Sequence, residues 1–337
     1  MPAMKNTRVS VIIPMYCASP FIKETLESVR SQTYEYWELI IVDDGSPDAS
    51  AEKAREFVAQ FPGMAQLLFH PGKENRGTSA SRNLGLEHAT GELVCFLDAD
   101  DVWDSGFLDF FVQMFDRNPE IAMAYGPALL WHGQQDDAVD HVQHLGIKMN
   151  SVVDSCDLFK KFLAGEADTP SPSGVLLRRK ALLDVGGWEE SFPGMYDDQV
   201  VYSKLLLAGG GAYVTDRCLY RYRQHPDSLC KVAAKERRNA GSRQNYLEWL
   251  RQYLIQAGQL SGDIEILIAE HIWYVQRMKE IEQLSTSGWW DQKMGALGSL
   301  LNLLHNQKNF ISAIKLGQRI VRQQLGIVGR ASKGSGH

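Results

Sequence analysis

The chain has 337 residues, of which 44% are hydrophobic and 23% are charged, a balance typical of a folded globular protein. Its length exceeds one average domain, and its net charge of −6 argues against a nucleic-acid binder, because a phosphate backbone requires a basic surface. The five cysteines are scattered and form no CxxC pair, so neither a zinc knuckle nor a disulfide framework is indicated, which favours a reducing compartment.

The first hundred residues alternate apolar runs with helical patterns, as in a mostly parallel sheet that is covered by helices. Four apolar runs are predicted to be strands, at residues 9–13, 39–42, 65–69 and 93–97. Helical spacing of apolar residues predicts helices over residues 21–29, 54–61 and 77–89. Ser19 is expected to cap the first helix, with Pro20 at its first position.

The following hundred residues give mixed signals, with short strands expected at 123–125 and 174–177. After about residue 231 the pattern becomes almost entirely helical. We therefore expect one domain over residues 1–230 and a helical region over residues 231–333. The last four residues, 334–337, read Gly-Ser-Gly-His and look like a cloning remnant.

Asp98-Ala99-Asp100 directly follows the predicted strand at 93–97. Two carboxylates at this spacing can reach one ligand, and Mg²⁺ or Mn²⁺ prefers oxygen ligands while it keeps substrate phosphates and water. The same triplet could instead be a solvated turn before a helix, with Asp101 or Asp104 as the cap, because such short motifs are common.

Two further polar clusters follow strands at the same edge, where open α/β sheets bind ligands. Residues 43–46 read Asp-Asp-Gly-Ser, and a carboxylate there could accept a hydrogen bond from a base or a ribose hydroxyl, or form an ordinary Asx turn. Residues 75–83 contain Arg76 and Arg82 near a helix start. That arrangement suits anionic oxygens, and it equally suits a plain solvated helix N-terminus.

A fourth cluster places Asp197 and Asp198 ahead of an apolar helix, with Asp197 eight residues after the end of the Gly-Gly-Trp-Glu sequence at 186–189. These carboxylates could be favourable charges at a helix N-terminus. Alternatively, one of them is a general base whose pKa is adjusted by its neighbour.

The order and spacing of all four clusters together resemble the inverting GT-A glycosyltransferases of family two. The matching segments are residues 9–16, 31–46, 75–83 and 91–100. The resemblance implies an α/β GT-A fold, that is, a Rossmann-like, mostly parallel sheet flanked by helices, with a C-terminal helical region. It places nucleotide-sugar binding at about residues 9–105 and the acceptor and catalytic part at about residues 106–230.

The resemblance also implies roles for residues on the nucleotide side. Pro14, Tyr16 and Asp44 would line the base and ribose of the nucleotide sugar, with Asp44 in contact with the base. Arg82 would lie near the base or the diphosphate. Asp98 would approach the ribose and the surroundings of the metal.

On the catalytic side, the resemblance makes Asp100 a ligand of Mn²⁺ or Mg²⁺, with His225 as a further metal or diphosphate contact. Asp198 would be the catalytic base. The family's Glu-Asp pair reads Asp197-Asp198 here, which leaves open which carboxylate acts. Residues 186–189 would border the donor sugar and the acceptor entrance.

The implied reaction transfers a sugar from a nucleotide diphosphate sugar, with UDP as the expected nucleotide, to a hydroxyl of a saccharide or lipid-linked acceptor in bacterial polysaccharide or glycolipid biosynthesis. The transfer would be a metal-assisted single displacement with inversion. A nucleotidyltransferase is one alternative, but residues 15–19 lack the glycine-rich, lysine-bearing loop it would need. A non-catalytic nucleotide- or carbohydrate-binding module is the other, and the intact acidic residues argue against it.

The C-terminal residues 292–337 contain seven Lys and Arg and no Asp or Glu. With Trp289, Trp290 and leucines at helical spacing over 297–304, residues 289–330 are typical of an amphipathic segment on an anionic membrane. The leucines could equally pack against the catalytic domain or a second subunit. No run of about 18 apolar residues and no N-terminal signal pattern is present, so we expect a cytoplasmic protein, peripheral at the inner face of the membrane.

Overall fold

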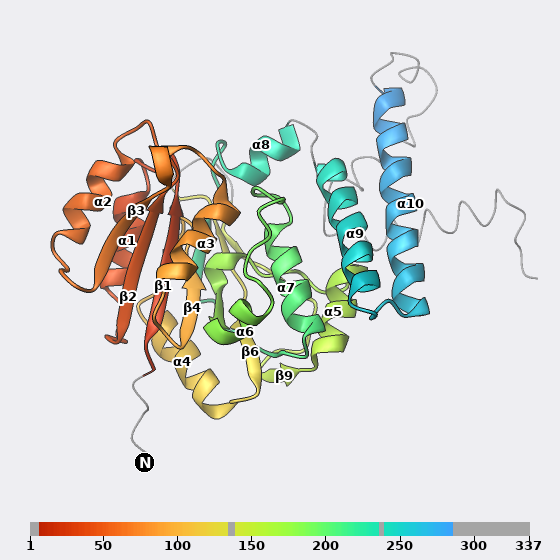
Figure 1. The fold of residues 1–337 in the computed structure, drawn as a ribbon, viewed down its shortest axis with the longest axis horizontal. Coiled ribbons are helices and arrows are strands. Elements are labelled where there is room, and N and C mark those ends of the chain that lie inside the picture. The colour runs from red at the N-terminus through yellow and green to blue at the C-terminus, as the bar shows by residue number, and fades with distance from the viewer. Residues whose placement is uncertain (1–6, 134–138, 236–238, 286–337) are drawn as a thin grey trace, which may run out of the picture.

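The structure is a computed structural model that describes residues 7–133, 139–235 and 239–285 (Figure 1). The amphipathic segment predicted at 289–330 and the remnant proposed at 334–337 lie outside the described residues.

The larger sheet contains strands from both halves of the chain. They are β1 (Val9–Met15), β2 (Trp37–Asp43), β3 (Ala65–Phe69), β4 (Leu93–Phe96), β6 (Ile121–Tyr125), β9 (Ser151–Val153), β10 (Val175–Arg178) and β11 (Gly211–Val214). Their order is β3-β2-β1-β4-β10-β6-β11-β9. Strands β3, β2, β1 and β4 are mutually parallel, and β10 runs antiparallel to both β4 and β6. The predicted mostly parallel α/β fold is confirmed, and all four strands predicted in the first hundred residues are present.

Helices cover both faces of this sheet (Figure 1). They are α1 (Ile22–Arg30), α2 (Ser50–Val58), α3 (Thr78–His88), α4 (Phe107–Arg117), α5 (Ser155–Ala164), α6 (Arg179–Asp184), α7 (Asp197–Leu207), α8 (Leu229–Lys235), α9 (Asn239–Gln256) and α10 (Gly262–Ser285), with short 3-10 turns at Pro71–Lys73 and Pro172–Gly174. Successive residues of the central strands point to opposite faces. Val11 and Leu39 therefore join one core with α1, α2 and α4, while Ile12 and Ile40 join a second core with α3, α5 and α7.

The start of the first helix differs from the sequence prediction. Helix α1 begins at Ile22, with Phe21 as its N-cap and no side-chain cap, so the predicted capping by Ser19 is wrong. The Ser19 hydroxyl and carbonyl oxygens instead accept hydrogen bonds from Lys53 Nζ at 2.8 and 2.6 Å, and its N–H donates to Asp48 at 3.1 Å. The residue therefore ties the first loop to α2.

A smaller sheet places the chain after residue 223 beside the acidic loop that follows β4. It consists of β5 (Val102–Trp103), β7 (Leu129–Trp131), β8 (His141–Val142) and β12 (Tyr220–Arg223), in the order β5-β12-β7-β8. Strand β12 pairs antiparallel with β5, so Tyr220 lies opposite Trp103. Because β5 directly follows residues 98–101, this pairing brings the chain after β12 to the same loop.

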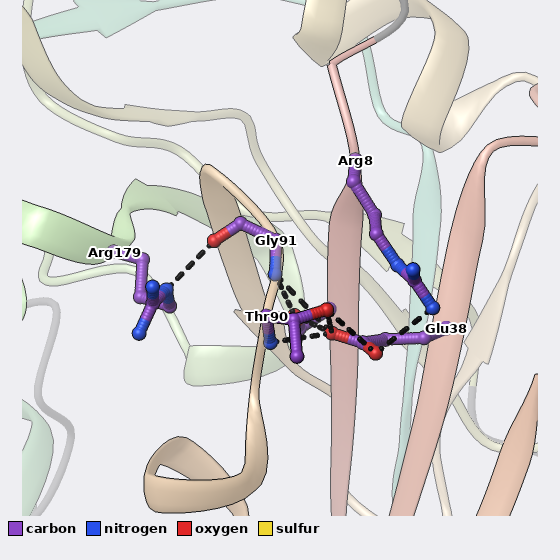
Figure 2. A network of polar contacts seen from close by, with 6 residues as sticks. Arg8, Glu38, Thr90, Gly91 and Arg179 are labelled. Carbon is purple, nitrogen blue, oxygen red and sulfur yellow. Dashed lines mark hydrogen bonds and ion pairs between the residues drawn. The ribbon is translucent and has the colours of Figure 1, made fainter.

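The amino ends of the central strands are held together by the buried carboxylate of Glu38 (Figure 2). It accepts hydrogen bonds from Ser10 Oγ at 2.5 Å, Thr90 N–H at 2.6 Å and Gly91 N–H at 3.2 Å, and it forms an ion pair with Arg8 at 3.1 Å. Burial alone would raise the pKa of Glu38, but these donors lower it below its ordinary value. This network lies at the edge opposite the predicted ligand site, so it stabilises the sheet.

The C-terminal helices α9 and α10 lie side by side and pack on the body of the molecule (Figure 1). The helical pattern predicted after about residue 231 is confirmed over α9 and α10, and Ile264, Ile268 and Val275 of α10 are buried. These side chains belong to the same hydrophobic core as Val201 of α7, so the core is continuous across residue 231, where the domain division stays a prediction. Within the described ranges, no helix combines the length and the hydrophobicity that crossing a membrane requires.

Candidate active site

Arg82 joins the acidic loop after β4 to the start of α7. The side chain is 4% exposed, and its Nη2 lies 2.7 Å from Asp98 Oδ1 while its Nη1 lies 2.5 Å from Asp197 Oδ2. The guanidinium also lies over the ring of Trp188, 4.3 Å from its centroid. Burial alone would lower the pKa of Arg82, but the two carboxylates raise it, so the group is a permanent buried cation.

The predicted base lies beside this ion pair. Asp197 is 6% exposed and bound by Arg82, whereas the neighbouring Asp198 remains partly exposed. Burial, followed by the charge of Asp197, raises the pKa of Asp198 to about 7, against the opposing effects of the Gln199 N–H at 2.7 Å and of Arg82. A carboxylate with a pKa near 7 is suited to accept a proton at neutral pH.

The two predicted metal ligands lie together. His225 Nε2 is 2.9 Å from Asp100 Oδ2, and the imidazole packs on Phe21 with a ring-centroid distance of 4.7 Å. The guanidinium of Arg223 donates to the Asp100 carbonyl oxygen at 2.7 Å, which fixes the loop from the side of β12. Residues 98–100 and the segment after β12 are thus held against each other.

The donor set fits a hard divalent cation that keeps other ligands. A carboxylate oxygen and an imidazole nitrogen converge from Asp100 and His225, and the side chains are 29% and 11% exposed. In the part of the chain that the structure describes, no group of three or more His, Cys, Asp or Glu side chains is assembled for a metal. Any metal here would therefore depend on phosphate and water for its remaining positions, as Mg²⁺ and Mn²⁺ commonly do.

Asp101 is a further acid of this loop that the sequence did not single out as functional. It is fully buried, and its Oδ1 accepts a hydrogen bond from the Arg223 N–H at 2.9 Å. Burial, followed by the charges of Asp100 and Asp98, raises its pKa well above the usual range. The sequence offered only a capping role, because a partner 122 residues away leaves no local signal.

The predicted nucleotide-side residues follow β1 and β2 at the same edge of the sheet. Pro14 is buried, and Tyr16 is 52% exposed. Asp44 is 4% exposed, and its carboxylate accepts hydrogen bonds from the N–H groups of Arg76 at 2.7 Å and Gly77 at 2.9 Å. The 43–46 and 75–83 clusters predicted from sequence are therefore in direct contact. A carboxylate has about four acceptor positions, so Asp44 keeps capacity for a ligand.

Gly45 lets these two loops approach closely. Its φ of +77° is a conformation that side chains with a Cβ rarely adopt. A Cβ at this position would lie 2.5 Å from the carbonyl oxygen of Lys73. The Asp-Asp-Gly sequence at 43–45 thus combines a carboxylate with the one residue that permits the contact.

The loop predicted to border the donor sugar and the acceptor is attached to α3. Asn83 Nδ2 donates to the Trp188 carbonyl oxygen and its Oδ1 accepts from the Trp188 N–H, both at 2.9 Å. Ser79 Oγ donates to the Phe192 carbonyl oxygen at 2.7 Å. Gly187 has φ +66°, and a Cβ there would lie 2.8 Å from Asn83 Oδ1. One helix, α3, therefore supports both Arg82 and this loop.

The sheet is mostly parallel in its first half, with acidic residues at its carboxyl edge and helices on both faces, and this fold is that of the GT-A glycosyltransferases. The structure is similar to that of the mannosyltransferase PcManGT from Pyrobaculum calidifontis in complex with GDP-Man and Mn²⁺, with a TM-score of 0.58. The similarity covers 95% of this chain and 88% of that chain at 18% identity. At this identity it shows the fold alone.

The chain belongs to glycosyl transferase family 2, whose model matches residues 10–184, more than half of its length. A relative from Nostoc sp., the uncharacterized glycosyltransferase alr2836, is 32% identical over 177 residues, or 52% of each chain. The Escherichia coli enzyme WfgD, a UDP-Glc:alpha-D-GlcNAc-diphosphoundecaprenol beta-1,3-glucosyltransferase, is 33% identical over 123 residues, 36% of this chain and 46% of WfgD. The chain thus spans about half the length of these relatives. The predicted family is confirmed, and the roles of the individual site residues stay predictions.

The raised pKa of Asp198 gives a stability prediction that needs no substrate. The pKa rises from an ordinary 3.8 to about 7 on folding, so the contribution of the carboxyl to stability is complete below pH 3.8 and is lost as the pH rises through 7. The free energy of unfolding of Asp198→Asn, measured by urea denaturation, should therefore exceed that of the wild type by about 1–4 kcal/mol at pH 8. The difference should be smaller at pH 4. Asp216→Asn, at an exposed carboxylate, is the control. A less stable Asp198→Asn variant at pH 8 would contradict the prediction.

Proposed function

We propose that this chain transfers a hexosyl group from a UDP-sugar to an acceptor hydroxyl with inversion, in bacterial polysaccharide or glycolipid biosynthesis. The observation that carries the proposal is a partly exposed carboxyl, Asp198, with a pKa near 7 beside the buried Arg82. Arg82 also binds Asp98, which lies on the same loop as Asp100, and His225 contacts Asp100 from the segment after β12. A proton acceptor and a candidate cation site thus share one connected set of side chains.

In this proposal Asp100 and His225 hold Mn²⁺ or Mg²⁺. A divalent cation supplies charge neutralisation for the departing diphosphate when it is bound there. Arg223 fixes the Asp100 backbone, and Phe21 fixes the plane of the His225 ring, so the two ligands are oriented before the donor arrives.

Asp198 accepts the proton of the attacking acceptor hydroxyl. Asp197 is the less suitable base, because its carboxylate is buried and is occupied by Arg82. The substitution of the family's glutamate by Asp197 leaves the acting base at the second position of the pair.

The nucleotide would lie across Pro14, Tyr16 and Asp44. Arg82 would support this site by holding Asp98 through their ion pair. Tyr16 offers an exposed ring for base stacking, and Asp44 offers a carboxylate for a base N–H. Uridine is proposed because WfgD, a relative in sequence, acts on UDP-Glc. The structurally similar mannosyltransferase PcManGT was solved with GDP-Man, so UDP-sugars and GDP-sugars should be compared as donors.

The alternatives from other classes make different predictions in the same assay. A nucleotidyltransferase would release pyrophosphate, and a non-catalytic module would release nothing. The family match favours neither, because residues 10–184 match a glycosyl transferase model.

The function is tested by measuring UDP release and transfer over a panel of nucleotide sugars with Mn²⁺, with EDTA as the metal-free control. Asp198→Asn should lower the transfer rate by about 10²–10⁴ and leave UDP affinity nearly unchanged, because the base acts on the acceptor. The wild-type rate should rise with pH through about 7 as Asp198 loses its proton. Near-normal turnover in Asp198→Asn would exclude Asp198 as the base, whereas Asp216→Asn should retain wild-type rate.

We also propose that the chain is cytoplasmic and that residues 289–330 bring it to an anionic membrane surface, where a lipid-linked acceptor would be found. The support is the sequence, in which residues 292–337 carry seven Lys and Arg and no Asp or Glu, shortly after Trp289 and Trp290. The full chain should co-sediment with liposomes that contain anionic lipid and should be released by high salt. Equal sedimentation after deletion of residues 289–330 would refute the membrane contact and favour packing on this chain or on a second subunit.

A further inference from the structure

The residue directly before the acidic pair has an unusual backbone. Tyr196 is the N-cap of α7, and its φ of +66° lies in the left-handed region, which a bulky aromatic residue rarely occupies. Such a conformation persists only where surrounding contacts determine it. The direction in which the chain enters Asp197 and Asp198 therefore depends on what holds Tyr196.

The contact that holds Tyr196 comes from the C-terminal helical region. Its ring stacks on Tyr246 of α9, with a centroid distance of 5.6 Å and an interplanar angle of 17°. Tyr246 is 3% exposed, and its hydroxyl forms a hydrogen bond of 2.9 Å with Ser203 Oγ of α7. One side chain of α9 thus contacts α7 at two points, the residue before the acidic pair and a residue two turns further on.

Helix α9 is itself fixed by α10. Arg243 Nη2 lies 2.9 Å from His271 Nδ1, and burial, together with the charge of Arg243, lowers the pKa of His271 to about 3. The imidazole is therefore neutral and accepts this hydrogen bond at physiological pH. Leu250 of α9 and Ile268 of α10 continue the contact into the core.

This arrangement lies beyond the segment that defines the family, because the family match ends at residue 184. A helix pair whose only task was to cover hydrophobic surface would need no aromatic contact with a strained residue beside the acids. Here the stacking surface, the strained backbone and the hydrogen bond to Ser203 all converge on the first two turns of α7.

We propose that Tyr246, acting through Tyr196, is a positioning residue that sets the direction of the Asp198 carboxylate toward the acceptor. The inference rests on the proposed function, in which Asp198 accepts the acceptor's proton. The C-terminal helices are then part of the catalytic unit. Changes at their contact with Tyr196 should alter turnover without altering donor binding. The contact involves α7 and α9, whereas the nucleotide is proposed to bind at Tyr16 and Asp44.

The test compares two substitutions in α9 that both remove buried volume. Tyr246→Leu removes the stacking surface and the hydroxyl, and it should lower kcat by about tenfold or more while the affinity for UDP with Mn²⁺ changes by less than about twofold. Leu254→Ala, at a fully buried position on the same helix, should lower the melting temperature through its cavity. Its kcat should stay within about twofold of the wild type, because Leu254 has no part in the stacking contact.

The conservative variant separates stacking from simple packing. Tyr246→Phe keeps the ring and loses only the bond to Ser203, so it should retain kcat within about threefold of the wild type. Equal kcat losses in Tyr246→Leu and Leu254→Ala, or parallel losses of kcat and UDP affinity in Tyr246→Leu, would overturn the inference. Those outcomes leave the proposed function intact if Asp198→Asn is still inactive. A fully active Asp198→Asn enzyme would instead overturn the proposed function and the positioning role with it.

Discussion

A single buried guanidinium, that of Arg82, lets two carboxylates share the interior of one edge of the sheet. Two like charges about 4 Å apart repel by about 4 kcal/mol at the effective dielectric of a protein, and each also loses hydration on burial. Arg82 offsets these costs for Asp98 and Asp197 because its planar fork reaches both through separate nitrogens. Burial still raises the pKa of Asp98, with Arg82 as the main opposing influence.

The ion pair between Arg82 and Asp197 gives two adjacent acids different surroundings. Asp197 forms an ion pair with the cation, whereas Asp198 has no direct ion pair with it and has a pKa near 7. The two ion pairs of Arg82 also join three separate segments of the chain. Arg82 lies on α3, Asp98 lies in the loop after β4, and Asp197 begins α7. The candidate base and the candidate cation site are therefore connected by one set of ion pairs, and in our proposal the C-terminal helices act on the base through α7.

The sequence predicts the strands and the edge of the sheet well, because apolar β-branched runs such as 9–13 and 39–42 carry their own signal. It also predicts that Asp44, Asp98 and Asp100 lie at this edge, since each follows a strand, whereas Asp197 and Asp198 are placed with them only by the family resemblance. It does not predict partners: the bond from Arg82 to Asp197 spans 115 residues, and the bond from Arg223 to Asp101 spans 122. The Ser19 cap failed for a related reason, because its oxygens found a distant donor in Lys53 that local capping rules do not see. Short strands such as β5 and β12 depend on their pairing with each other, so the hydrophobic periodicity of the sequence does not predict them.

Arg82 and Asp197 should stabilise each other across the site, and a double-mutant cycle measures this directly. Urea denaturation of the wild type, Arg82→Gln, Asp197→Asn and the double variant gives the interaction energy of the pair. We expect a coupling of about 2–5 kcal/mol, with Arg82→Gln the least stable protein because it leaves the buried Asp197 and the partly buried Asp98 without their cation. A coupling below about 0.5 kcal/mol, with additive single effects, would contradict it.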